Sequence, residues 1–201
     1  LKGIDLSNKD LTGTILKGTD LTDVILPNIS LSEKNFQRTI FDGLDLSGKD
    51  LSKSSLWDIS IKNTNLENTD LREADLRAVD LTEIKNNSLS GANLESTSFM
   101  LANLSGVNLS NVILANTNFL LTNLSDVDFT VIANIPNGVV FPKANLTNSN
   151  FEGLRLAPID VKKVSFPNEA YLKQELEPND FSIAVEDLVI SHAGTSLDNK
   201  Y

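Results

Sequence analysis

Large apolar residues recur at every fifth position along most of this chain. The first series runs from Leu6 to Leu81, and the period then slips by three residues near position 86. A second series runs from Leu89 to Phe129, and a third begins at Phe141 and ends at Val161 or Phe166. Helices repeat near 3.6 residues and strands at 2, so neither explains this spacing. A chain that turns a corner every five residues does explain this spacing.

We call each of these large apolar residues a centre. The residues just before each centre are also regular. Two positions before it, the residue is mostly small or β-branched, and one position before it, Asp or Asn is frequent, as in Ala74-Asp75-Leu76 and Ala102-Asn103-Leu104. Four five-residue sides close a square coil with the centre and the residue two before it pointing inward. Successive coils then stack about 4.8 Å apart through backbone hydrogen bonds. Asp and Asn are interpreted as turn residues whose side chains bond to nearby backbone.

This pattern resembles the pentapeptide-repeat family, whose motif is A(D/N)LXX. The resemblance covers residues 1–166 and implies an all-β solenoid, a right-handed quadrilateral β-helix. We therefore expect two units, the β-helix over 1–166 and a C-terminal helical cap or linker over 167–201. Because the chain starts at Leu1 rather than Met, we also expect it to be a piece of a longer protein.

Three lysines depart from the pattern. Lys9, Lys34 and Lys49 occupy positions that should point into the coil. A buried, unpaired ammonium is costly. We expect these corners to be distorted, with the lysines reaching out to solvent. The five-residue period is interrupted at 84–88 and at 130–140. We expect these two breaks to be loops that bulge from the coil.

The C-terminal segment follows different rules. Asn168 and Asp180 are candidate N-caps for two helices, which would end near Glu177 and Ala193. We expect the second helix to cover the open end of the β-helix, since exposed backbone edges favour aggregation. A homodimer contact is the alternative. The residues predicted to make either contact are Phe181, Val185 and Leu188.

The composition argues against chemistry on this chain. There is no Cys, and His192 is the one histidine, so thiolate sites, His-rich metal sites and His-based relays are disfavoured. No phosphate-binding glycine loop or metal-ligand spacing occurs. We therefore predict no enzyme activity, no catalytic residue, no cofactor and no bound metal.

The charge is strongly acidic but unevenly distributed. The net charge is −10, which disfavours direct nucleic-acid binding. Between Asn86 and Pro142 there is no Lys or Arg, and the acids are Glu95, Asp126 and Asp128. No apolar run is long enough to span a bilayer, and no signal peptide is visible. The expected location is the cytoplasm, or a host cell if the chain belongs to a secreted effector.

Two groups of surface residues are candidates for binding a protein partner. Trp57 follows a centre and should share a column of stacked coils with Arg77, and an exposed Trp beside Arg is typical of contact hot spots. Met100-Leu101 and Leu120-Leu121 follow centres twenty residues apart and should stack as an apolar patch. Such patches tend to mark interfaces.

Two function hypotheses follow from the resemblance. The first is a rigid, non-catalytic protein-interaction module, as in bacterial effectors where pentapeptide repeats accompany a catalytic domain and present substrates. The second is a DNA mimic that binds DNA gyrase or another topoisomerase, as in quinolone-resistance pentapeptide proteins. The near-neutral stretch 86–142 argues against the second, because mimicry of DNA needs charge along the rod.

Overall fold

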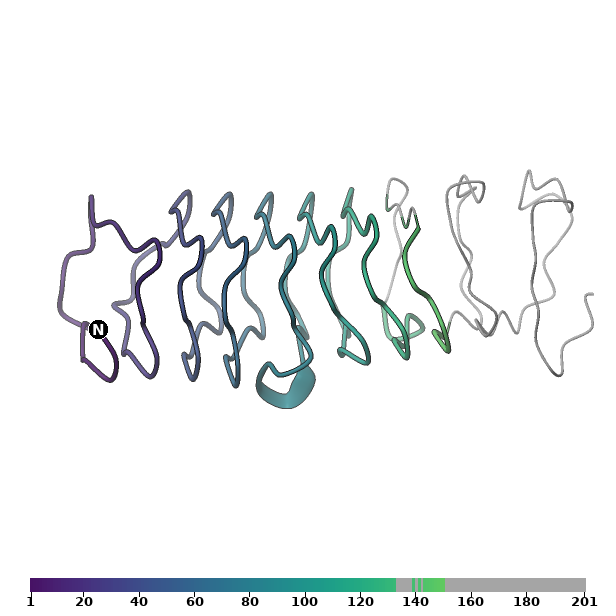
Figure 1. The fold of residues 1–201 in the computed structure, drawn as a ribbon, viewed down its shortest axis with the longest axis horizontal. Coiled ribbons are helices and arrows are strands. Elements are labelled where there is room, and N and C mark those ends of the chain that lie inside the picture. The colour runs from purple at the N-terminus through teal and green to yellow at the C-terminus, as the bar shows by residue number, and fades with distance from the viewer. Residues whose placement is uncertain (133–138, 140, 142, 151–201) are drawn as a thin grey trace, which may run out of the picture.

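The chain winds into a stack of square coils, as the five-residue period predicts. The structure is a computed structural model, and it describes residues 1–132, 139, 141 and 143–150. Figure 1 shows the coils lying side by side along one axis, with the N-terminus at one end. The predicted C-terminal helices and the 166/167 boundary lie outside the described residues.

Each coil pairs with the next through short parallel bridges rather than through long strands. Bridges join residues twenty apart in the first part of the chain, for example Asp50 to Asp70 and Ser55 to Asp75. No strand longer than one bridge residue occurs among the described residues, because the backbone turns before a second pair can form.

A tight turn produces each corner. The carbonyl oxygen of a centre accepts a hydrogen bond from the amide three residues on, as between Leu21 and Val24 at 3.0 Å. The second residue after nearly every described centre has φ between 49° and 76°. A positive φ at that position defines type II β-turns and favours Gly or Asn. Here Gly occupies it at seven sites, but Asp, Glu, Lys, Arg, Ala, Ser and Leu also occur.

The core is a continuous column of apolar side chains. Nearly all described centres from Leu11 onward are buried, and the phenylalanines stack along the axis. Phe119 lies between Phe99 and Phe141, with ring centroids 5.6 Å and 5.3 Å away and nearly parallel planes. Each coil therefore contributes one layer to a shared interior and cannot bury its apolar residues alone.

Polar side chains in the interior bond to the coil before them. Seven Thr and Ser hydroxyls donate to carbonyl oxygens of a centre one coil back: Thr39, Thr64, Thr69, Thr97, Thr117, Thr122 and Ser149. These bonds satisfy both groups without water, as burial requires.

The inward lysines behave differently from the expectation. Lys9 is exposed, but Lys34 and Lys49 are partly buried. Lys34 Nζ donates to the carbonyl oxygen of Leu11 at 3.3 Å, and Lys49 Nζ donates to that of Pro27 at 3.1 Å. The expectation that the lysines reach out to solvent was wrong for these two. The Lys34 ammonium takes the role that an inward Thr hydroxyl has elsewhere, and the Lys49 ammonium bonds instead to Pro27, the residue after a centre.

The first break is a short insertion that leaves the stacking intact. It forms the 3-10 helix η1 (Lys85–Asn87), which bulges from the coil in Figure 1. Across η1 the bridge partners are 23 residues apart, as between Asp70 and Asn93. Across the second break, at 130–140, the bridge partners are 22 residues apart, as between Asn123 and Asn145. The coil thus continues in register across both breaks, and at the first one the three extra residues form η1 outside the stack.

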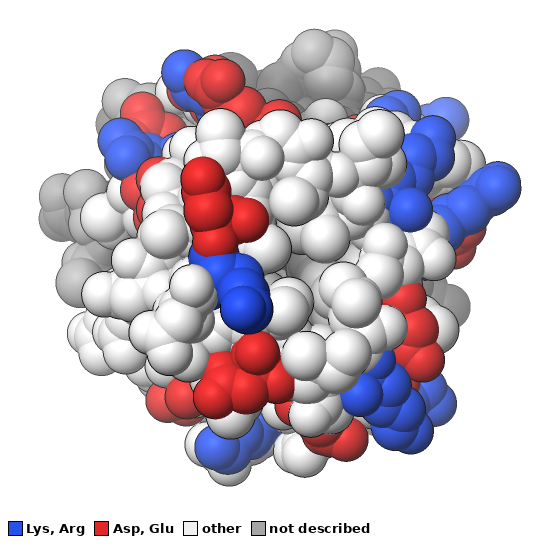
Figure 2. Space-filling view, turned by 90° about the vertical axis from the view of Figure 1, so that its left-hand side faces the viewer, with Lys and Arg blue, Asp and Glu red and all other residues white. Residues whose placement is uncertain are grey.

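The N-terminal end of the coil stack carries charged groups among uncharged ones. Figure 2 views this end, where Lys, Arg, Asp and Glu lie around the rim and also form a short column near the middle. Leu1 and Ile4 are nearly half exposed there. Among the described residues, none forms a helix of the length and hydropathy needed to span a membrane.

Candidate protein-binding faces

Stacking of the coils brings the two predicted groups of surface residues into one column. Backbone hydrogen bonds link Arg38 N to Trp57 O, Asp58 N to Arg77 O, Ala78 N to Met100 O and Leu101 N to Leu120 O, at 3.0–3.4 Å. Trp57, Arg77, Met100 and Leu120 therefore follow one another along the axis, with Leu101 and Leu121 in the adjacent column. We call these six residues the tryptophan–leucine face.

Sequence reasoning predicted the members of this face but not its continuity. The candidates were treated as two separate groups because the three-residue slip interrupts the twenty-residue count between Arg77 and Met100. Adding that slip to the count would have placed Met100 directly after Arg77. The structure makes the connection through the hydrogen bond from Ala78 to Met100.

The charged end of the face is held in place by pairing. The Arg38 guanidinium carbon lies 5.7 Å from the centroid of a Trp57 ring, and Arg38 also pairs with Asp58 at 3.5 Å. Trp57 is partly buried, so its indole is oriented rather than free. Arg77 makes two hydrogen bonds to the carboxylate of Asp75, at 2.7 and 2.6 Å. These bonds, and then the charge of Asp75, raise the pKa of Arg77.

The other end of the face is apolar and accessible. Leu101 is 56% exposed and Leu121 is 45% exposed. Met100 and Leu120 are partly buried beside them. This arrangement provides a contact surface for apolar side chains and contains no group that could act as an acid, base or nucleophile.

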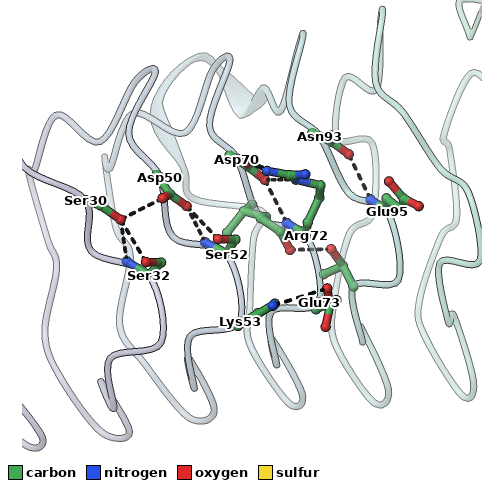
Figure 3. Close-up of polar contacts among 12 residues, drawn as sticks. Ser30, Ser32, Asp50, Ser52, Lys53, Asp70, Arg72, Glu73, Asn93 and Glu95 are labelled. Carbon is green, nitrogen blue, oxygen red and sulfur yellow. Dashed lines mark hydrogen bonds and ion pairs between the residues drawn. The ribbon is translucent and has the colours of Figure 1, made fainter.

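A second face of the coil is wholly polar. Figure 3 shows it as two columns, Ser30–Asp50–Asp70–Asn93 and Ser32–Ser52–Arg72–Glu95. Asp50 accepts hydrogen bonds from the hydroxyls of Ser30 and Ser52, at 2.6 and 2.7 Å. The bond from Ser30 is the main reason that the pKa of Asp50 is lowered. We call the residues labelled in Figure 3 the polar face.

Two of the four acids of the polar face are paired with basic neighbours. Arg72 binds the carboxylate of Asp70 through Nε and Nη2, and this pairing is the main cause of the lowered pKa of Asp70. Lys53 Nζ lies 4.0 Å from Glu73 (Figure 3). The basic groups thus interrupt the row of acids along this face.

Asp and Asn make the same turn at the corners. Asp50 Oδ1 accepts from the amide of Ser52 at 3.0 Å, and Asn118 Oδ1 accepts from the amide of Leu120 at 2.9 Å. The interpretation of these residues as turn formers is supported by this geometry. Asn103, Asn123 and Asn145 in addition form an amide ladder with 2.9 Å steps, which sequence reasoning did not anticipate.

No catalytic or metal-binding arrangement appears in the part of the chain that the structure describes. No group of three or more His, Asp or Glu residues there could hold a metal ion. The remaining predicted contact residues, Phe181, Val185 and Leu188, and also His192, lie outside the described residues.

The fold and its faces define a solenoid repeat protein with a polar and a partly apolar surface. The family model for pentapeptide repeats matches eight copies, within residues 1–28, 59–85, 84–114 and 102–130. The chain belongs to the pentapeptide-repeat family, which confirms the resemblance noted from the sequence.

Solved structures of similar fold come from different settings. A trypsin-treated variant of QnrB1, a plasmid-mediated fluoroquinolone resistance protein, is 19% identical, with 82% of this chain and 84% of that chain covered and a TM-score of 0.50. HetL, a pentapeptide repeat protein involved in heterocyst differentiation regulation from the cyanobacterium Nostoc, is 21% identical over 75% of this chain and 79% of that chain, with a TM-score of 0.30. At these identities the likeness to QnrB1 shows the fold alone. No curated protein matches the sequence.

Proposed function

We propose that this chain is a rigid, non-catalytic scaffold that binds a protein partner through the tryptophan–leucine face. The observation that carries the proposal is the continuity of Trp57, Arg77, Met100 and Leu120 along one column. Trp and Arg are enriched among the residues that dominate binding energy at interfaces, and Met is enriched at interfaces in general. The leucines add apolar area around them. A stack of coils that share a core keeps these side chains at fixed spacing, so little ordering is needed when the partner binds.

We further propose that this scaffold is part of a larger, bacterial effector-type protein. The β-helix would hold a substrate or partner beside a catalytic domain encoded in the same reading frame. The native gene tests this point: a catalytic domain in frame with residues 1–201 supports the effector form, and a frame that contains no other domain contradicts it. The scaffold proposal itself does not depend on the outcome.

The alternative is a DNA mimic that binds a topoisomerase. The net charge of −10 favours it, and the fold is shared with QnrB1. Against it, Asp70 and Glu73 of the polar face are paired with Arg72 and Lys53, and few acids occur from 86 to 132. A supercoiling assay with purified gyrase tests it: protection from a quinolone, or inhibition at micromolar protein, would favour mimicry.

The experiment for the scaffold proposal is site-specific photocrosslinking. A photoreactive residue replaces Leu120 on the tryptophan–leucine face or, as a matched control, Ser52 on the polar face. The proposal predicts that one protein crosslinks at position 120 and not at position 52. The affinity of that purified protein should then fall by roughly 30-fold for Trp57→Ala or Leu120→Asp, as expected for hot-spot residues. Equal crosslinking at both positions, or unchanged affinity in both variants, would contradict it.

A further inference from the structure

Two leucines on the tryptophan–leucine face adopt a backbone conformation that suits leucine poorly. Leu101 has φ of 63° and Leu121 has φ of 56°. At this turn position the other described residues with positive φ are Gly, Asn, Asp, Ser, Ala or long charged residues. A branched apolar side chain gains nothing from the left-handed region. Both leucines are also about half exposed, so burial in the core does not explain them.

Leu101 and Leu121 combine a strained backbone with an exposed side chain, which indicates a role in binding rather than in folding. Backbone strain that folding does not require is a reason to consider function. Gly, Asn or Asp fill the same position at many other corners, so the turn itself does not require leucine. Leucine in adjacent coils instead doubles the width of the apolar surface beside Met100 and Leu120.

Basic residues flank this apolar surface along the axis. Arg77 lies one coil before Met100, and Lys143 lies one coil after Leu121 in the column that contains Leu101. Lys143 is exposed and forms no ion pair with any described residue. Between Arg77 and Lys143, the described residues of the two columns are Ala78, Met100, Leu101, Leu120 and Leu121, none of which is charged. A partner that covers the patch would therefore meet an unpaired positive charge at the Lys143 end, whereas Arg77 at the other end is already paired with Asp75.

The spacing of the coils favours a helix over an extended strand as the bound element. Neighbouring leucines along the axis are one coil apart, about 4.8 Å. One turn of an α-helix advances about 5.4 Å, whereas side chains on one face of a strand repeat at about 6.8 Å. A helix lying along the rod thus keeps its apolar side chains in step with two or three coils, and a strand does not.

We propose that the tryptophan–leucine face binds an amphipathic helix of the partner, with leucine-like residues over Leu101 and Leu121 and an acidic residue near Lys143. This inference rests on the proposed function and names the partner's chemistry. Lys143 lies one coil step, about 4.8 Å, beyond Leu121, so the acidic residue should lie about one helical turn beyond the last leucine-like residue of the helix.

The test uses designed helical peptides that contain no Trp and carry a fluorescein label. One has an apolar stripe followed one helical turn later by a Glu on the same face, and a second has Lys in place of that Glu. Fluorescence anisotropy should show at least tenfold tighter binding of the Glu peptide, with the difference shrinking as salt is added. The only Trp of the protein, Trp57, should change its emission on binding.

Variants separate a docking role from a structural one. The double variant Leu101→Asn/Leu121→Asn should lose at least tenfold in affinity for the Glu peptide while its Tm is unchanged or higher. Ser96→Asn is the control, because Ser96 has φ of 57° and lies on another face; it should leave affinity unchanged. A Tm lowered by roughly 4 °C or more in the double variant, or full binding by it, would overturn the inference. Equal binding of the Lys peptide would overturn the acidic-helix partner but leave the scaffold proposal standing.

Discussion

Met100 follows directly after Arg77 in the coil stack, although 23 residues separate them in the chain. The amide of Ala78 donates a 3.0 Å hydrogen bond to the carbonyl oxygen of Met100, as it would to a residue nineteen positions on in an uninterrupted coil. The three extra residues of η1 therefore lie outside the coil, at one of its corners. The surface on one side of the rod continues past them unchanged.

Removal of this insertion should be tolerated. Deleting Lys85–Asn87 places Ile84 and Ser88 at their regular positions before the centre Leu89. The deletion removes the positive φ of Asn86 and Asn87 and the buried Asn87 Oδ1, which has no hydrogen-bond partner in the structure. We expect the free energy of unfolding to change by less than about 1 kcal/mol or to increase. Urea denaturation measures it, and a loss of cooperative unfolding would contradict the stacking described here.

The phenylalanine stack should contribute strongly to stability. Phe119 is fully buried between Phe99 and Phe141, so Phe119→Ala leaves a cavity that the rigid coils cannot close. We expect a loss of about 3–5 kcal/mol. Leu120→Ala next to it serves as the control, with an expected loss below about 1.5 kcal/mol because Leu120 is only partly buried. Similar losses in the two variants would show that the core is not continuous here.

Lys34 should be replaceable by Thr at no cost. Its ammonium donates to the carbonyl oxygen of Leu11, and the Thr39 hydroxyl makes the corresponding bond to Leu16 at 2.7 Å. Lys34→Thr keeps a donor and removes a partly buried charge, so the free energy of unfolding should rise by about 0.5–1 kcal/mol. Lys34→Met removes the donor and should be less stable than Lys34→Thr. The reverse order, measured by thermal unfolding, would show that the ammonium does not act as the hydroxyl's counterpart.

Acid should destabilise the coil in part through Asp50. The pKa of Asp50 is lower in the folded protein than its ordinary value of 3.8, mainly because Ser30 donates to it. The resulting stabilisation is therefore complete above pH 3.8 and is lost as the pH falls through the folded-state pKa. Ser30→Ala should make the decline in unfolding free energy between pH 5 and pH 2.5 shallower. An identical pH profile in the wild type and Ser30→Ala would contradict the assignment.

The five-residue period was sufficient to predict a corner every five residues and the residues of the core, and the family resemblance that the repeat motif carries implied the square coil. Leu21, Leu71 and Phe119 are all buried because a centre at every fifth position can point only inward once the chain turns at that interval. The Asp and Asn turns were predictable for the same reason, since their hydrogen bonds reach only two residues along the chain. Local spacing determines all of these features.

Only the tertiary structure decided what the surface looks like and how the inward lysines are satisfied. The link from Arg77 to Met100 depends on how η1 leaves the coil, and the bond from Lys34 to Leu11 crosses 23 residues. Both depend on hydrogen bonds between neighbouring coils, whose register shifts whenever residues are inserted. The sequence by itself determined which side chains face solvent. Stacking decided which of them lie next to one another, because contacts across coils are set by the pairing of whole turns and not by distance along the chain.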